Sequence, residues 1–189
     1  MCLAVSKRHR NLFTGKYKPK KLRKDLTVYK ILISEKDMKD CAHTPFFGMS
    51  VRFKGGYFTP PTIDYEDFKM LEDSVVDNEC IGKTKGMYAY HAYLNRDDAI
   101  KTMFYYYTTT TSERFRTYDE NMKETIQHQL PYLYECVIPA GSYVYYGAHS
   151  SSNQIATNAI TIIQKPRIRV VRGNDNALSC AFDEPQKYR

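Results

Sequence analysis

The sequence predicts an α+β fold in a single domain, with a mostly antiparallel sheet and two or three packed helices. Segments with two-residue hydrophobic alternation lie near both ends of the chain, and a segment with helical periodicity lies in the middle. The chain has 189 residues, 42% of them hydrophobic, so it can bury a core. We therefore expect a basic arm over residues 1–24, an α+β domain over residues 25–178 and a polar tail over residues 179–189.

The basic arm accounts for the net positive charge of the chain. Residues 7–24 contain nine lysines and arginines and no acid, which exceeds the formal net charge of +7 for the whole chain. Such a block is expected to be extended and to attract phosphates or an acidic protein surface, although a solvated tail without a partner is the alternative. Phe13 and Tyr17 lie among these cations, where aromatic rings can stack on bases. The predicted nucleic-acid-binding residues are Lys16, Lys18, Lys20, Lys21, Arg23 and Lys24.

A strand and a short helix are expected to follow the arm. Residues 26–34 alternate and are rich in β-branched side chains, which predicts a strand. Proline and paired glycine then predict loop with one short strand at residues 49–53. Residues 62–76 predict a helix that buries Ile63 and Phe68.

The clearest helical pattern covers residues 95–107. Asn95 is placed to cap this helix, and two aspartates occupy its first turn, where carboxylates favour the positive end of the helix dipole. Four threonines at residues 108–111 predict its end, because β-branched side chains and competing hydroxyls disfavour helix. Alternation over residues 86–94 predicts a strand directly before it.

The last third of the chain predicts further strands. Residues 132–138 and 142–146 alternate on either side of a Pro-Ala-Gly corner, which predicts a hairpin with tyrosines on both faces. A buried tyrosine needs a partner for its hydroxyl, so one face is expected to pack on helices and the other to meet a ligand or partner chain. Structural packing alone is the alternative. A helix is expected at residues 119–131, and strands at residues 159–164 and 167–172.

The tyrosine-rich strands supply a predicted small-ligand site through ring stacking and hydroxyl contacts. A second basic stretch, residues 165–172, alternates so that its arginines oppose Ile168 and Val170. That stretch could continue a phosphate-binding surface. The predicted ligand-binding residues are Tyr88, Tyr90, Tyr143, Tyr145, Arg167 and Arg169.

Spacing argues against three other kinds of site. Residues 80–86 contain Gly-Lys-Thr, but Asp77 occupies the position of the first glycine of a P-loop. The cysteines and histidines lack the spacing of a zinc site, so no metal is expected. Cys2 could act as a nucleophile after removal of Met1, but the chain continues into the basic arm instead of a core strand.

The five cysteines are odd in number and widely spaced, which predicts free thiols in a reducing compartment. No apolar run is long enough to span a bilayer, and no secretory signal is visible, so no membrane contact is expected. We expect the protein in the cytoplasm of the host cell or associated with a virion. The sequence is also compatible with a homo-oligomer.

Four segments carry a resemblance to known proteins. The "MCL" start, "VYKIL" at residues 28–32, "MYAYHAYLNRDDA" at residues 87–99 and "CVIPAGSYVYYG" followed by "QIATNAITII" are similar to a family of small uncharacterised proteins of gut bacteria and their phages. More distantly, the order of elements resembles ADP-ribosyltransferases. That resemblance implies NAD as a ligand and Lys30, His91 and Tyr93 as catalytic candidates.

Two departures from the transferase pattern favour binding over catalysis. Lys30 stands where the transferases have an arginine or histidine, and residues 154–163 contain no glutamate. We therefore expect a non-enzymatic, phage-encoded accessory protein without a cofactor, which binds a phosphate-bearing ligand. The ligand is either a nucleotide (NAD or another) at the tyrosines or a nucleic acid along the arm. An NAD-using transferase and a virion or assembly component are the alternatives.

Overall fold

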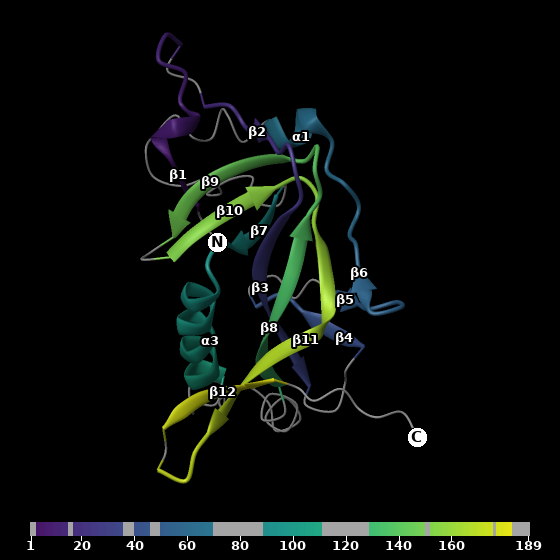
Figure 1. Ribbon diagram of the computed structural model, residues 1–189, viewed down its shortest axis with the longest axis vertical. Helices are drawn as coiled ribbons and strands as arrows, with labels where there is room; N and C mark the ends of the chain where they lie inside the picture. The colour runs from purple at the N-terminus through teal and green to yellow at the C-terminus, as the bar shows by residue number, and fades with distance from the viewer. Residues whose placement is uncertain are drawn as a thin grey trace, which may run out of the picture. The chain divides into compact units, whose positions relative to one another are not determined.

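The computed structural model describes residues 3–14, 17–35, 40–45, 50–69, 89–110, 129–149, 152–175 and 177–182 (Figure 1). The chain divides into two compact units, each built from three segments. Unit 1 consists of Met1–Tyr29, Thr59–Asp98 and Cys136–Ile162. Unit 2 consists of Lys30–Phe58, Ala99–Glu135 and Ile163–Arg189.

The described secondary structure is dominated by strands. Unit 1 contains β1 (Ala4–Val5), the 3-10 helix η1 (Lys7–His9), β2 (Lys20–Lys21), α1 (Tyr65–Lys69), β7 (Tyr90–Tyr93), β9 (Tyr143–His149) and β10 (Ser152–Thr157). Unit 2 contains β4 (Cys41–His43), β5 (Ser50–Arg52), β6 (Tyr57–Phe58) and β12 (Leu178–Phe182). Elements with residues in both units are β3 (Leu26–Glu35), α3 (Arg96–Thr110), β8 (Gln129–Ile138) and β11 (Thr161–Arg172).

The fold is nearly all-β, so the prediction of an α+β fold with two or three packed helices is wrong. The 12 described strands form one sheet, in which eight follow the order β1-β9-β10-β7-β3-β8-β11-β12. The other four lie off this path: β2 pairs with β9, β4 with β3 and β5, and β6 with β11. Among the described residues only α1 and α3 are α-helices, and α1 covers five residues. The helix predicted at residues 119–131 ends in strand, because β8 begins at Gln129, and the rest of it lies outside the described residues. Valine, isoleucine and tyrosine, which favour strands, recur through the last third of the chain.

Helix α3 begins where the sequence predicts and ends later. The backbone N–H of Asp97 donates to the side-chain oxygen of Asn95 at 2.7 Å, which confirms the cap. The helix continues through Thr110, although the threonines predicted its end. The hydroxyl of Thr108 donates to the carbonyl of Tyr105 at 2.8 Å, which is a bond to the preceding turn that a helix tolerates.

The corner at residues 139–142 does not form the predicted hairpin. Strand β8 lies between β3 and β11 in the sheet, whereas β9 lies between β1 and β10. Two hydrogen bonds from the corner go instead to residues 22–25: the N–H of Gly141 donates to the carbonyl of Leu22 and that of Ala140 to the carboxylate of Asp25. Gly141 has φ of 87°, which a residue with a side chain rarely adopts.

Strand β10 in unit 1 pairs with β9 on one side and with β7 on the other, both antiparallel. Figure 1 shows β9 and β10 side by side. Ala156 lies opposite His91 on β7 and opposite Tyr145 on β9, so these three residues share one face of the sheet. This face carries the buried cluster of unit 1: Leu3, Tyr17, Phe68, Tyr145 and Ala156.

Antiparallel pairs also organise unit 2. Strand β4 pairs with β5, and β11 pairs with β12 over Ile168–Arg172. The ring of Phe53 stacks on that of Tyr134 with centroids 5.3 Å apart, and both side chains are buried. The polar tail predicted from residue 179 contributes to β12, which extends to Phe182.

Candidate functional site

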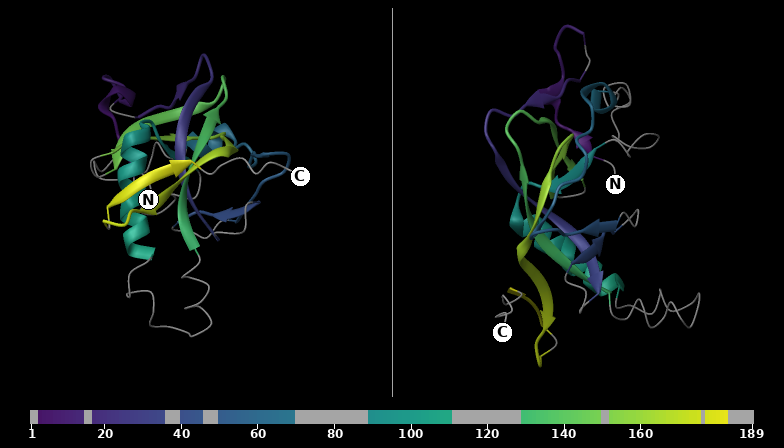
Figure 2. Two further views of the ribbon diagram at one scale, coloured as in Figure 1. Left: turned by 60° about the horizontal axis from the view of Figure 1, so that its bottom comes forward. Right: turned by 90° about the vertical axis from the view of Figure 1, so that its right-hand side faces the viewer.

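Residues 3–24, here called the basic segment, are held against β9 in the described part of the chain. Strand β1 pairs with β9 at Ala148 and Gly147, and β2 pairs with it at Val144 and Tyr143. The N–H of Ser6 adds a hydrogen bond of 2.8 Å to the carbonyl of Tyr146. In Figure 2 the described residues between η1 and β2 extend beyond β9. The predicted extended arm is therefore folded.

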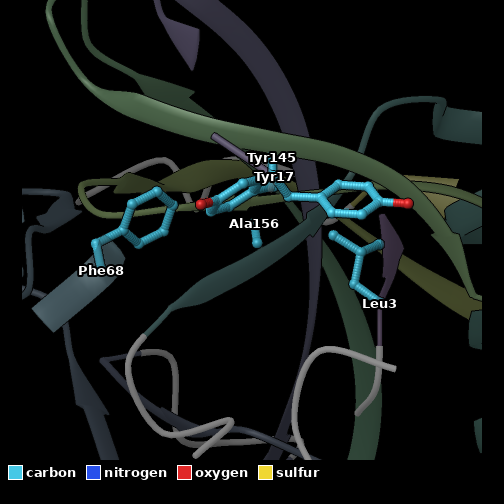
Figure 3. Packing of buried hydrophobic residues seen from close by; sticks show 5 residues of the cluster. All are labelled: Leu3, Tyr17, Phe68, Tyr145 and Ala156. Carbon is cyan, nitrogen blue, oxygen red and sulfur yellow. The ribbon is translucent and has the colours of Figure 1, made fainter. Parts of the chain in front are cut away.

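Two apolar side chains anchor this segment. Leu3 and Tyr17 are buried in the cluster with Phe68 and Tyr145, and Figure 3 shows the two tyrosine rings between Phe68 and Leu3. Burying a side chain of this size stabilises the folded state by about 1.5–3 kcal/mol. Tyr17 is thus part of the core, although its place among the cations suggested stacking on bases.

His9 fastens the same segment through its ring. The side chain is 4% exposed; its Nδ1 lies 3.0 Å from the carbonyl oxygen of Lys18, and its Nε2 lies 2.9 Å from the backbone nitrogen of Tyr146. A backbone N–H can only donate, so Nε2 is the acceptor and Nδ1 carries the hydrogen. Burial lowers the pKa of His9; the Lys18 hydrogen bond opposes this shift, and the charges of Lys20 and Arg8 add to it. The geometry therefore requires the neutral ring.

The cations of the basic segment are exposed to solvent. Two of them lie over rings of β9: the guanidinium of Arg8 is 3.9 Å from the ring centroid of Tyr146, and the ammonium of Lys21 is 5.9 Å from that of Tyr143. Such contacts restrain flexible side chains and leave their charges accessible. Lys16 lies outside the described residues. The exposed cations are Lys7, Arg8, Arg10, Lys18, Lys20, Lys21, Arg23 and Lys24.

The four predicted tyrosines do not share one face. Tyr143 and Tyr145 lie two residues apart on β9 and point to the same side of the sheet. The ring of Tyr143 contacts that of Tyr65, with the ring centroids 4.5 Å apart. Tyr90 lies opposite Thr157, which lies opposite Val144, so Tyr90 is on the other face. Its hydroxyl donates to the carbonyl of Pro61 at 2.6 Å, and burial raises its pKa. Tyr88 lies outside the described residues.

The catalytic candidates are divided between the units. His91 and Tyr93 are on β7 in unit 1 and share the face of Tyr145, whereas Lys30 belongs to unit 2. Gln154 lies opposite Tyr93 on the same face and is 1% exposed. Neither the nitrogen nor the oxygen of its side-chain amide has a hydrogen-bond partner in the described structure. A buried amide without partners is costly, which makes Gln154 a candidate that the sequence did not indicate.

Arg167 is buried instead of lying on an exposed charged face. It is 3% exposed, its guanidinium lies 4.1 Å from the ring centroid of Tyr132, and it donates to the hydroxyl of Tyr134 at 3.2 Å. Arg169, two residues on, is only partly exposed and pairs in register with Ala181. These contacts make Arg167 a structural residue of unit 2.

Two further features are absent from the described residues. These residues contain no group of three or more histidine, cysteine, aspartate or glutamate side chains that could hold a metal ion. None of their helices is long and apolar enough to cross a membrane.

The sequence reasoning missed His9, Leu12 and Gln154. Burial of His9 has no local signal, because the histidine lies between arginines in a charged block. Leu12 is noticeable only as an apolar residue beside Phe13. Comparison with known proteins adds no candidate, because no family model, curated protein or solved structure matches the chain.

Proposed function

We propose that the basic segment binds nucleic acid by contacting its phosphates. The observation that carries this proposal is a row of eight exposed lysines and arginines on a segment without any acid from Lys7 to Lys24. Lysine and arginine contacts to phosphates supply most of the sequence-independent affinity for nucleic acid.

The folded state of the segment supports this function over that of a solvated tail. Backbone pairing with β9 and the ring of His9 hold the backbone of the segment in place. Less conformational entropy is therefore lost when its cations bind a ligand. The backbone from Lys20 to Leu22 follows β9 from Val144 toward Ser142, because β2 pairs there and the N–H of Leu22 donates to the carbonyl of Ser142. A nucleic-acid backbone can run beside this stretch, where Lys20 and Lys21 are both exposed.

Charge reversal tests the proposal. We would measure binding of a labelled single-stranded oligonucleotide by fluorescence anisotropy at pH 8, where His9 stays neutral in every variant. Lys20→Glu, Arg23→Glu and Lys24→Glu together should weaken binding by more than about tenfold, because three phosphate contacts are replaced by repulsion. The matched control reverses Arg52, Lys54 and Arg172, three exposed cations of unit 2. Equal losses in the two triple variants would contradict a site on the basic segment.

A second candidate function is nucleotide binding on the sheet face that carries Gln154. The amide of Gln154 offers one donor and one acceptor side, which matches the edge of an adenine base. Tyr145 and His91 share that face, and because Tyr145 is buried in the core cluster, a nucleotide reaches the amide only by displacing part of that cluster.

Equilibrium dialysis with ATP and with NAD tests this second function. Gln154→Leu should abolish nucleotide binding and leave oligonucleotide binding intact. Absence of nucleotide binding by the unaltered protein would contradict this second function. Release of nicotinamide from NAD would favour the transferase that the distant resemblance implies.

A further inference from the structure

We infer that Leu12 and Phe13 form a base-contacting tip, which makes the basic segment bind single-stranded nucleic acid in preference to duplex. This inference rests on the proposed function, because it assigns the form of nucleic acid that the same segment binds. It begins from exposure: Leu12 is 94% and Phe13 97% exposed. The other exposed large hydrophobic residues of the described structure are covered to a greater extent.

Hydrogen bonds join the described backbone on the two sides of this tip. Arg10 and Tyr17 form an antiparallel bridge, and the N–H of Lys18 donates to the carbonyl of His9 at 2.9 Å. The side-chain oxygen of Asn11 accepts from the N–H of Phe13 at 2.8 Å and from that of Thr14 at 3.0 Å. An asparagine that bonds the backbone two and three residues ahead stabilises a turn.

The anchors below the bridge point the other way. Tyr17 is buried in the core cluster and His9 is bonded to β9, so both ends of the loop are tied to the sheet. The two apolar side chains at the tip therefore cannot reach the core without breaking these contacts. Their exposure is a property of the folded segment.

The charges around the tip indicate what covers it. Exposed cations precede it at Lys7, Arg8 and Arg10 and follow it at Lys18 and Lys20. A partner that covers the tip and contacts these cations presents apolar surface with anionic groups on either side of it. Single-stranded nucleic acid does so, because each phosphate is followed by a base whose face can stack on an aromatic ring.

Duplex nucleic acid offers phosphates to the cations but no exposed base faces to Leu12 and Phe13. Its bases are stacked inside, and an apolar side chain reaches them only by opening a base step, which costs free energy. An anionic membrane surface also combines charge with apolar depth. Here the chain beyond the tip follows β9 through Lys20 and Lys21 as far as the hydrogen bond between Leu22 and Ser142, and this narrow path suits a strand better than a plane.

Tryptophan offers a direct probe, because the chain contains none. Phe13→Trp places the only indole at the tip, and stacking on bases quenches indole fluorescence. Tyr57→Trp is the matched control, since Tyr57 is an exposed aromatic residue of unit 2. We would titrate both variants with oligothymidylate, a blunt duplex of equal charge, heparin and vesicles rich in phosphatidylserine.

The Phe13→Trp variant should be quenched by oligothymidylate and not by heparin, whereas the Tyr57→Trp control should change with neither. In parallel, Phe13→Ala should weaken oligothymidylate binding by about tenfold and duplex binding by less than about twofold. The salt dependence should stay the same, because no phosphate contact is removed.

The possible failures are distinguishable. If the unaltered protein binds no oligonucleotide, the proposed function fails. The unaltered protein could instead bind oligonucleotide with the salt dependence expected for phosphate contacts. If the tip indole is then not quenched, or if Phe13→Ala weakens single-strand and duplex binding equally, the proposed function stands and the base-contacting tip is overturned. A blue shift on vesicles without quenching by oligothymidylate would replace it with a lipid-surface contact.

Discussion

The ring of His9 joins two parts of the chain that lie far apart in sequence. Its Nε2 accepts the backbone N–H of Tyr146 at 2.9 Å, while its Nδ1 lies 3.0 Å from the carbonyl oxygen of Lys18. The ring is also stacked against that of Tyr146, with centroids 5.8 Å apart. One neutral imidazole therefore adds to the strand pairing and the buried anchors that hold the basic segment on β9.

Acid should release this contact. Burial lowers the pKa of His9 below the usual 6.5, and the charges of Lys20 and Arg8 lower it further, so the unfolded chain binds the proton more readily than the folded one. The contribution of His9 to stability is thus complete above about pH 6.5 and is lost as the pH falls through the folded-state pKa. Protonated Nε2 can no longer accept from Tyr146.

The measurement compares the melting temperature of the unaltered protein with that of His9→Gln between pH 5 and pH 8. The difference should be largest above pH 7 and shrink toward acid, and subtracting the variant removes the effect of the other titrating groups. A difference that is independent of pH would contradict a buried neutral ring.

Truncation of two aromatic residues of the basic segment should have very different effects on the free energy of unfolding. Tyr17→Ala removes a buried ring from the cluster with Leu3 and Tyr145 and should lower the free energy of unfolding by about 3 kcal/mol. Phe13→Ala removes an exposed ring and should change it by less than about 0.5 kcal/mol. Urea denaturation measures both. Similar small effects would mean that the segment is not anchored as described.

Arg167 should matter for stability and not for binding. It is buried against Tyr132 and Tyr134, so Arg167→Gln leaves a poorly filled and poorly bonded site. We expect a loss of about 2–4 kcal/mol in the free energy of unfolding with unchanged oligonucleotide affinity in the folded protein. A variant of normal stability that fails to bind would return Arg167 to the ligand-binding residues.

Gln154→Leu should stabilise the ligand-free protein. The substitution keeps the volume similar and removes a buried amide for which the described structure shows no hydrogen-bond partner. We expect a gain of about 1–2 kcal/mol in thermal or urea unfolding, because the desolvation cost of the amide disappears. Destabilisation instead would show that the amide is bonded in the protein and would weaken the second candidate function.

Elements with local signals are predicted from the sequence and then confirmed. The alternation over residues 26–34 becomes β3, and the Asn95 cap begins α3. Burial of Phe68 is likewise confirmed. Each of these depends on residues close together in the chain, where spacing and capping chemistry decide the outcome.

Features that depend on distant partners are not predicted. The corner after Ile138 has the sequence of a hairpin, but its N–H groups bond Leu22 and Asp25, and β9 pairs with segments from the N-terminal 21 residues instead of with β8. The charge of the basic segment predicts an extended chain, but burial of Leu3 and Tyr17 holds the segment against the sheet. Tertiary contacts override local preference at both places.

The dependence of oligonucleotide affinity on salt tests the central claim most directly. If the eight exposed cations of the basic segment contact phosphates, the logarithm of the association constant should fall linearly with the logarithm of salt concentration, with a slope of about −5 to −6 for a single strand. Reversal of Lys20, Arg23 and Lys24 should reduce that slope by about two. A slope near zero, or one that this reversal leaves unchanged, would contradict nucleic-acid binding by the basic segment.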